Sequence, residues 1–294
     1  MRILLTGANG QLGQELQRVL CSEDVIPTCR PDYDLMHPGL GDKLIAQRPD
    51  VVIHAASYTD VDGCERDPDR ALRVNVEGTR RVAEGVARAT ARLVYISTDY
   101  VFDGKKAEPY TERDPVNPLN VYGRTKWMGE QEALAACPEA LVVRTSWLYG
   151  LHGKNFVKTI LQLAATQQEI RVVNDQRGSP TYARDLAEVI AKLIQRHVSG
   201  VVHAGGAGEC TWYDFAKAIL QEAGSRCRVV PISSAEAGRL AVRPYYSVLS
   251  NARLSQYGLA LPPWQDGLTR FMALYAAMTP ATFSSGEGRT DHRA

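Results

Sequence analysis

Short apolar runs alternate with longer amphipathic stretches along the first half of the chain. The short runs are ILLT (3–6), VIPTC (25–29), VVIHAA (51–56), RLVYIS (92–97) and ALVVRT (140–145). The longer stretches with helical spacing are QLGQELQRVL (11–20), DRALRVNVEGTRRVAEGVARA (69–89) and NVYGRTKWMGEQEALAA (120–136). Continuous apolar runs of this length suit strands that are buried on both faces. The alternation therefore predicts an α/β fold with a doubly wound parallel sheet in residues 1–150.

The pattern becomes less regular beyond residue 150. It predicts helices over 154–167, 185–196, 211–223 and 263–278, and strands over 170–173, 201–205 and 228–232. Because neither an internal repeat nor a low-complexity linker separates the halves, we expect residues 151–278 to form mainly a smaller α/β substrate-binding lobe. This lobe can contribute elements to the first domain, and a cleft should lie between the two. Residues 279–294 lack periodicity and are rich in Ser, Thr, Gly and charge, which predicts a disordered tail.

Composition and charge narrow the class of protein. Of the 294 residues, 45% are hydrophobic and 23% are charged, which is typical of a globular protein with a large core. The net charge of +1 gives no basic excess for a nucleic-acid backbone, so we expect no nucleic-acid partner. The apolar run in MRILLTGANG is too short for a membrane span or a secretory segment. We therefore expect no membrane partner, a cytoplasmic location, six reduced cysteines and no metal site.

Three glycines follow the first predicted strand. In TGANGQLGQEL, Gly7, Gly10 and Gly13 lie between that strand and a helix, where backbone N–H groups can meet a pyrophosphate. A Cβ atom at these positions would hold the phosphates away. A glycine trio alone is also typical of a tight turn, but its place in a βαβ unit predicts a dinucleotide site. The spacing is GxxGxxG rather than GxGxxG.

The second predicted strand ends in Thr28, Cys29 and Arg30 rather than in an acidic residue. An acidic residue there would bind the ribose 2′-hydroxyl of NADH, whereas the guanidinium fork of Arg30 suits the 2′-phosphate of NADPH. We therefore expect NADPH in preference to NADH. Asp32 and Asp34 lie just beyond and could reverse this preference.

A tyrosine and a lysine lie four residues apart on one face of the predicted helix 120–136. These residues are Tyr122 and Lys126, and such a pair is also common by chance on solvated helix faces. Thr98 and Asp99 end the fourth predicted strand, and ligands gather at the carboxyl ends of parallel strands. Thr98 can therefore face the same cleft as Tyr122, although a threonine in this place also commonly just begins a loop.

Several ordered motifs resemble those of one family. TGANGQLG, STDYVFDG, YGRTK and RTSWLYG are similar to motifs of the extended short-chain dehydrogenase/reductase family, which has a Rossmann fold. SYTDVDGCE, NVYG, NDQRGSPT and RPYYSVLS extend the resemblance to residue 250, most closely to reductases of dTDP-linked 4-keto-6-deoxy sugars. The resemblance implies NAD(P)H-dependent reduction of the C4 ketone of such a sugar, with dTDP-4-dehydro-L-rhamnose as the expected substrate and dTDP-L-rhamnose as the product.

The resemblance also implies roles for individual residues. Thr98, Tyr122 and Lys126 match the catalytic triad of the family. Its cofactor contacts match Gly10, Gln11, Leu12, Asp34, Leu35, Ala55, Ala56 and Ser57, together with Tyr122 and Lys126. Its sugar contacts match Asp99 and Trp147, beside Thr98 and Tyr122. Part of the family carries Mg²⁺ at a dimer contact, which implies a homodimer, but a full set of carboxylates for Mg²⁺ is not recognised here.

The three triad residues suit ketone reduction. The reaction requires a hydride at carbon and a proton at oxygen, where negative charge develops. Tyr122 is the expected proton donor, and because a free phenol has a pKa of about 10, we expect Lys126 to lower the pKa of Tyr122. Lys126 can also bond the nicotinamide ribose, and Thr98 can donate a second hydrogen bond to the oxyanion.

Other functions remain as alternatives. Reductases for other dTDP-4-keto sugars, such as the dihydrostreptose type, would share these motifs. An epimerase or 4,6-dehydratase of this fold would return the hydride, but dehydratases place Asp and Glu after the threonine, whereas Asp99 and Tyr100 follow Thr98 here. Non-catalytic regulatory subunits bind the dinucleotide without turnover, and the complete set of Thr98, Tyr122 and Lys126 argues against this function.

The sequence allows more than one role for two further residues. Arg243, in VRPYYS, could pair with the diphosphate of the substrate or could be a structural arginine. His54 lies inside a buried apolar run, which favours a core residue over a catalyst.

Overall fold

The computed structural model describes residues 1–278, and its largest unit is a six-stranded parallel sheet. The strands are β1 (Arg2–Thr6), β2 (Asp24–Thr28), β3 (Val51–His54), β4 (Arg92–Thr98), β5 (Leu141–Thr145) and β10 (Gly200–His203). Their order is β10-β5-β4-β3-β1-β2, and every neighbouring pair is parallel. Every residue of β3 and β5 is buried. The predicted doubly wound parallel sheet is therefore confirmed.

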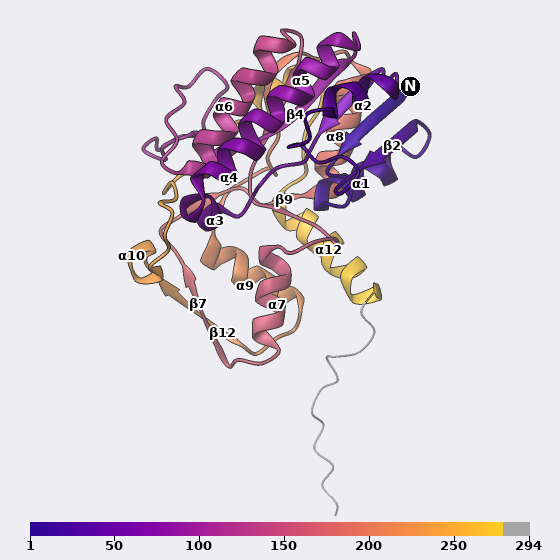
Figure 1. Cartoon of the computed structure of the whole chain (residues 1–294). Coiled ribbons are helices and arrows are strands. Elements are labelled where there is room, and N and C mark those ends of the chain that lie inside the picture. Colours follow the sequence, from indigo (N-terminus) through magenta and orange to yellow (C-terminus); the bar gives the residue numbers. More distant parts are fainter. Residues whose placement is uncertain (279–294) are drawn as a thin grey trace, which may run out of the picture.

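Helices cover both faces of this sheet (Figure 1). The elements on one face are α1 (Gln11–Val19) and α8 (Ala183–Gln195), and those on the other are α2 (Leu40–Ala46), α5 (Gly78–Arg88) and α6 (Val121–Ala136). Because successive strand side chains point to opposite faces, Ile3 and Leu5 of β1 pack with α1 and α8, whereas Leu4 packs with the other helices. The apolar runs in the sequence thus supply two separate cores.

The strand order places a ligand site at one edge of the sheet. The chain moves from β1 outward to β2 and then returns to add β3 on the other side of β1. The loops that follow β1 and β3 therefore diverge, and ligands bind in the crevice that this reversal opens at the carboxyl ends of the strands.

A second lobe lies below the sheet in Figure 1. Its elements are α7 (Phe156–Ala164), β7 (Glu169–Val173), α9 (Trp212–Glu222), β12 (Arg228–Ile232), α10 (Ser234–Ala237) and α12 (Trp264–Met278). Short paired strands join them: β6 (Leu148–Tyr149) with β9 (Thr181–Tyr182), and β8 (Arg177–Gly178) with β11 (Cys210–Thr211). Phe215, Trp264 and Phe271 lie in the apolar core of this lobe. β7 and β12 are parallel and fully paired in register.

Residues beyond 150 also belong to the sheet. β10 pairs with β5, and α8 packs against α1. α11 (Ala252–Gln256) lies beside β10. Thus the chain begins the second lobe, returns to the first domain with α8 and β10, leaves again to add α9 and β12, and returns once more with α11.

The long helix predicted over 69–89 is interrupted in the structure. After α3 (Val61–Arg66), it consists of α4 (Pro68–Leu72), a π-helical turn η1 (Arg73–Glu77) and α5. The extra residue of a π turn changes the direction of the side chains around it. Its buried Asn75 points at the loop after β3, as described below.

Two sequence expectations concern membranes and the end of the chain. Within residues 1–278, no helix combines the length and the apolar character needed to cross a membrane. The tail predicted to be disordered, 279–294, lies outside the described residues.

Candidate active site

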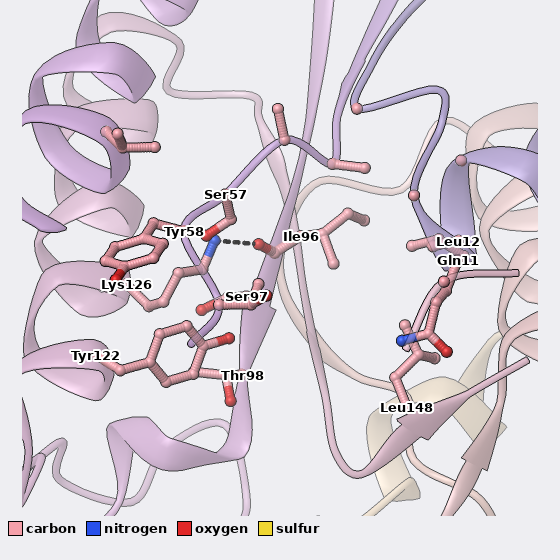
Figure 2. A pocket seen from close by; sticks show the side chains of 18 of the residues that line it. Gln11, Leu12, Ser57, Tyr58, Ile96, Ser97, Thr98, Tyr122, Lys126 and Leu148 are labelled. Carbon is pink, nitrogen blue, oxygen red and sulfur yellow. Dashed lines mark hydrogen bonds between the residues drawn. The ribbon is translucent and has the colours of Figure 1, made fainter. Parts of the chain in front are cut away.

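A cavity of about 950 Å³ lies at the carboxyl ends of the strands and extends to the second lobe. Every residue that the sequence assigned to the site lines it: Gly7, Gly10, Gln11, Leu12, Gly13, Arg30, Asp34, Leu35, Ala55, Ala56, Ser57, Thr98, Asp99, Tyr122, Lys126 and Trp147. Figure 2 shows Tyr122, Lys126 and Thr98 on one wall, with Gln11 and Leu12 on the opposite wall. The fold therefore brings together segments that are far apart in the sequence.

The glycine loop after β1, residues 7–13, packs so closely against neighbouring backbone that a Cβ atom on Gly7 or Gly13 would clash. Gly7 has φ +71°, and a Cβ atom on it would lie 2.8 Å from the backbone N of Ala56. A Cβ atom on Gly13 would lie 2.2 Å from the carbonyl oxygen of Gly7. Gly10 precedes α1, whose first turn has no side-chain cap, so its N–H groups are open to an anion. These observations fit the diphosphate of a dinucleotide.

Side chains of both charges lie at the end of β2. Arg30 and Asp34 both line the cavity, whereas Asp32 is exposed and lies outside the lining. Asp34 Oδ1 accepts a hydrogen bond from the backbone N of Met36 at 3.0 Å. Leu35 is buried against the backbone of α5, where a Cβ atom on Gly78 would lie 2.9 Å from the Leu35 Cβ. A cationic fork and a carboxylate are thus both available to an adenosine ribose.

Two glycines let α6 lie directly on β4 and the turn that follows it. A Cβ atom on Gly123 would lie 2.0 Å from the carbonyl oxygen of Tyr100, and one on Gly129 would lie 2.4 Å from the Tyr95 hydroxyl. The Asn120 side chain caps the helix by accepting a hydrogen bond from Gly123 N at 2.8 Å. This close packing brings the Tyr122 hydroxyl to Thr98 (Figure 2).

Burial controls the charges of Tyr122 and Lys126. Burial raises the pKa of Tyr122 well above that of a free phenol, although a hydrogen bond with Thr98 acts in the opposite direction. Burial lowers the pKa of Lys126 to about 7, against the raising effect of Glu130. Lys126 Nζ donates to the Ile96 carbonyl at 2.7 Å and lies 4.2 Å from the centre of the Tyr95 ring.

The expectation of a lowered pKa for Tyr122 is therefore wrong, because its pKa is raised. The physical reason is that both groups are buried together, so desolvation favours the neutral form of each. Moreover, the Lys126 ammonium is engaged by a carbonyl and an aromatic ring.

Asp99 is a buried carboxyl group at the cavity wall. Its Oδ1 accepts a hydrogen bond from Thr98 Oγ1 at 3.0 Å. Its Oδ2 has no hydrogen-bond partner among the described residues. Burial raises the pKa of Asp99 to about 7. A buried carboxyl oxygen without a partner is uncommon, and it leaves this residue of the cavity wall able to form one more polar contact.

Trp147 belongs to an aromatic stack that the sequence did not indicate. Its backbone has φ +45°, and its ring stacks on Trp212 with centroids 3.5 Å apart and planes 6° apart. A Cβ atom on Gly178 would lie 2.4 Å from the Trp147 ring, so this ring needs the glycine. Phe156 packs on Trp212 at 4.5 Å. Trp212 also lines the cavity, and no local signal in its predicted helix pointed to it.

Sequence reasoning also missed the polar contacts that hold the site in place. Asn75 Oδ1 accepts hydrogen bonds from Ser57 Oγ at 2.9 Å and Tyr58 N at 2.8 Å. Its Nδ2 donates to Thr125 Oγ1 at 3.1 Å. The π turn thus connects the loop after β3 to the helix that carries Lys126.

A buried ion pair lies beneath the Tyr122–Lys126 face. Arg144 on β5 donates to both oxygens of Glu130 on α6, at 2.9 and 2.6 Å, and Ser97 Oγ donates to Glu130 at 2.5 Å. Glu130 lies one turn beyond Lys126, and this helical spacing was the available signal for it.

Arg243 and His54 are both bonded to other side chains of the protein and do not line the cavity. Arg243 donates to both oxygens of Asp62, at 2.8 and 2.9 Å, and this bond lowers the pKa of Asp62 to about 2. Arg243 is not among the cavity-lining residues. His54 is buried between Thr6 at 2.7 Å and Thr79 at 3.2 Å. Within residues 1–278, no group of three or more His, Cys, Asp or Glu side chains is arranged to hold a metal ion.

Known proteins resemble this chain over nearly its whole length. The family described as RmlD substrate binding domain matches residues 1–277. The dTDP-4-dehydrorhamnose reductase of Mycobacterium tuberculosis is 42% identical, over 95% of this chain and 94% of the relative. The dTDP-4-keto-6-deoxy-D-glucose reductase of Streptomyces niveus is 38% identical, over 94% of this chain and 98% of the relative.

A solved structure of a relative has the same fold as this chain. The dTDP-4-dehydrorhamnose reductase of Bacillus anthracis, in complex with NADP, has a TM-score of 0.90 and 42% identity, over 93% of this chain and 99% of that one. Family match, sequence identity and fold agree, and the chain belongs to the RmlD family of dTDP-4-dehydrorhamnose reductases.

Proposed function

We propose that the protein reduces the C4 ketone of a dTDP-linked 4-keto-6-deoxy sugar, with dTDP-4-dehydro-L-rhamnose as the substrate and dTDP-L-rhamnose as the product. The observation that carries this proposal is the shared cavity, in which Tyr122 and Thr98 lie opposite the glycine loop of β1. A ketone held between these walls can meet a proton donor on one side and a dinucleotide on the other. Membership of the RmlD family supports the same activity.

NADPH is the proposed cofactor, with NADH as the alternative. Gly7, Gly10 and Gly13 would hold its diphosphate, and Arg30 would meet the 2′-phosphate. The complex of the Bacillus anthracis relative with NADP supports this preference. A catalytic efficiency with NADH about tenfold above that with NADPH, measured as kcat/KM, would contradict it.

The side chains of this chain supply the proton and stabilise the developing charge. When bound, the reduced nicotinamide supplies the hydride. Tyr122 is fully protonated near neutral pH because its pKa is raised, so it can donate a proton to the C4 oxygen. Thr98 lies beside Tyr122, and its hydroxyl can stabilise negative charge on that oxygen when it turns away from Asp99 Oδ1, to which it donates in this structure. Lys126 would hold the nicotinamide ribose and orient it toward the ketone.

Sugar recognition is proposed for the wall opposite the glycine loop and for the second lobe. Asp99 offers a carboxyl oxygen without a partner among the described residues, and Trp147 offers the edge of a fixed aromatic stack. The relative named dTDP-4-keto-6-deoxy-D-glucose reductase makes another dTDP-4-keto sugar the second candidate substrate. A homodimer and a cytoplasmic location remain predictions from the sequence.

Product analysis tests the proposed reaction. The protein is incubated with NADPH and dTDP-4-dehydro-L-rhamnose, or with its C3 and C5 epimers, and the products are identified by NMR. We expect dTDP-L-rhamnose, with one NADPH oxidised for each product molecule. Product without net NADPH oxidation would indicate an epimerase or dehydratase, and cofactor binding without any turnover would indicate a regulatory subunit.

Replacing Tyr122 tests the proton donor. Tyr122→Phe keeps the ring but removes the proton, so kcat should fall by about a hundredfold or more. The affinity for NADPH, measured by fluorescence titration, should change little. Tyr257→Phe, outside the cavity lining, is the matched control and should retain full turnover. Turnover of Tyr122→Phe within about threefold of the parent would reject the assignment.

A further inference from the structure

A loop of the second lobe lies against the glycine loop of the first. Asn155 Nδ2 donates a hydrogen bond to Gln11 Oε1 at 3.0 Å, across the junction of the lobes. A Cβ atom on Gly153 would lie 3.2 Å from Gln11 Cγ, so the backbone of this loop approaches the start of α1 closely. Gly153, Lys154 and Asn155 all line the same cavity as Gly10 and Gln11.

The shape of this loop is fixed by its own polar groups. Asn155 is buried, accepts a hydrogen bond from Lys158 N at 3.1 Å as the cap of α7, and donates to the Gly150 carbonyl at 2.8 Å. Lys158 Nζ donates to the carbonyl of Leu151 and, at 3.2 Å, to that of Gly153. Lys158 is therefore occupied within the loop, and the backbone that carries Lys154 is held in place.

Lys154 is the free cation at this wall. Its side chain is exposed, and it is not paired with a carboxylate within residues 1–278, whereas Lys106 pairs with Asp114 at 2.8 Å. The glycine loop itself, residues 7–13, contains neither lysine nor arginine. A diphosphate bound there would receive backbone N–H groups but no balancing positive charge from its own loop.

The other cations of the cavity lie on different walls. Arg30 follows β2, Arg73 begins the π turn η1, and Arg70 of α4 stacks at 4.5 Å over the Tyr58 ring. Lys126 donates to the Ile96 carbonyl. Of these cation-bearing segments, within residues 1–278, only the loop with Lys154 forms a hydrogen bond to Gln11, which it makes through Asn155.

We propose that Lys154 binds the diphosphate of the dinucleotide held on the glycine loop, so that cofactor binding fastens the second lobe to the first. This inference rests on the dinucleotide of the proposed function. A flexible ammonium on a fixed loop can reach a diphosphate without requiring a particular orientation of its oxygens. The contact crosses the same junction as the Asn155–Gln11 hydrogen bond.

Binding measurements without sugar test this proposal. NADPH, NADH and ADP-ribose are titrated by fluorescence or calorimetry into the parent, Lys154→Ala, Lys154→Arg and the exposed control Lys192→Ala. We expect Lys154→Ala to weaken all three ligands alike, by about fivefold at low salt, because each carries the diphosphate. Lys154→Arg and Lys192→Ala should bind as the parent does. Raising the salt concentration should reduce the difference between Lys154→Ala and the parent, since salt screens exposed charges.

Further measurements distinguish a misfolded variant, a failure of the Lys154 proposal and a failure of the proposed function. Equal thermal unfolding of the variants establishes that Lys154→Ala is folded. Parent-like binding of all three dinucleotide ligands by Lys154→Ala would overturn the inference while leaving the proposed function intact. Weaker binding of dTDP to the NADPH-loaded protein, with unchanged NADPH affinity, would assign Lys154 to the substrate diphosphate and also overturn it. A parent that binds no dinucleotide would instead refute the proposed function itself.

Discussion

Burial decides the protonation of the titratable side chains that meet at the end of β4. Tyr122 stays a phenol, whereas Lys126 and Asp99 have pKa values of about 7. A proton donor must keep its proton until charge develops on the substrate, and a raised pKa does this. The ammonium of Lys126 is only partly populated near neutral pH, so ligands that add negative charge nearby would favour its charged form.

The buried carboxyl group of Asp99 predicts a pH-dependent stability. Its folded pKa of about 7 lies above the ordinary value of 3.8, so the folded protein binds this proton more tightly than the unfolded chain does. The resulting stabilisation is complete below about pH 4 and is lost as the pH rises through about 7. Asp99→Asn removes this titration, so its melting temperature relative to the parent should increase from about pH 5 to about pH 8.

Thermal unfolding of both proteins across this pH range measures the effect. Asp69→Asn, which changes an exposed carboxylate, provides the matched control and should show a constant difference from the parent. A constant difference for Asp99→Asn as well would show that the carboxyl group is ionised throughout.

At the scale of elements, α6 is held by an ion pair as well as by close packing. Glu130 connects this helix to Arg144 on β5 and to Ser97 on β4. Both charged side chains of the pair are almost completely buried, at 5% and 1% exposure. Removing one charge would leave the other buried without compensation, which is far costlier than losing a surface pair.

The corresponding prediction concerns Glu130→Gln. This change should lower the free energy of unfolding by about 3 kcal/mol, because the Arg144 guanidinium stays buried without its counter-charge. Urea denaturation followed by circular dichroism measures the loss. Glu139→Gln, at an exposed position just beyond α6, should change stability little. An equal, small effect of both substitutions would show that water or another group compensates Arg144.

At the scale of the whole molecule, the first domain is completed by residues distant in sequence. The core between the sheet and α1 includes Leu186 and Ile190 of α8 and Val202 of β10. Without them, β5 would become an exposed edge and an apolar face of the sheet would meet water.

A fragment of residues 1–150 should therefore not fold by itself, although it contains the glycine loop, Tyr122 and Lys126. We expect it to aggregate or to lack cooperative unfolding by circular dichroism, while the full chain, prepared in parallel, unfolds cooperatively. A soluble fragment with a sharp thermal transition would mean that α8 and β10 are dispensable for the first domain.

Local sequence patterns determined most of the first domain and the composition of its cavity. Apolar runs specify β1, β3, β4 and β5 because these strands are buried on both faces. The edge strand β2 is an exception, since only its last residue, Thr28, is buried. The glycine loop after β1 and the pair of Tyr122 and Lys126 depend on spacings within one turn or one loop, which the sequence displays directly.

Tertiary structure alone decided the protonation of the site residues and several of the side-chain contacts around them. Arg243 meets Asp62 across 181 positions of the chain, and Trp147 meets Trp212, through contacts that no local spacing encodes. The spacing of Tyr122 and Lys126 suggested a lowered phenol pKa, but burial raises it. The physical reason is that a pKa depends on the water and charges that surround a group from every direction, and only the folded chain fixes those surroundings.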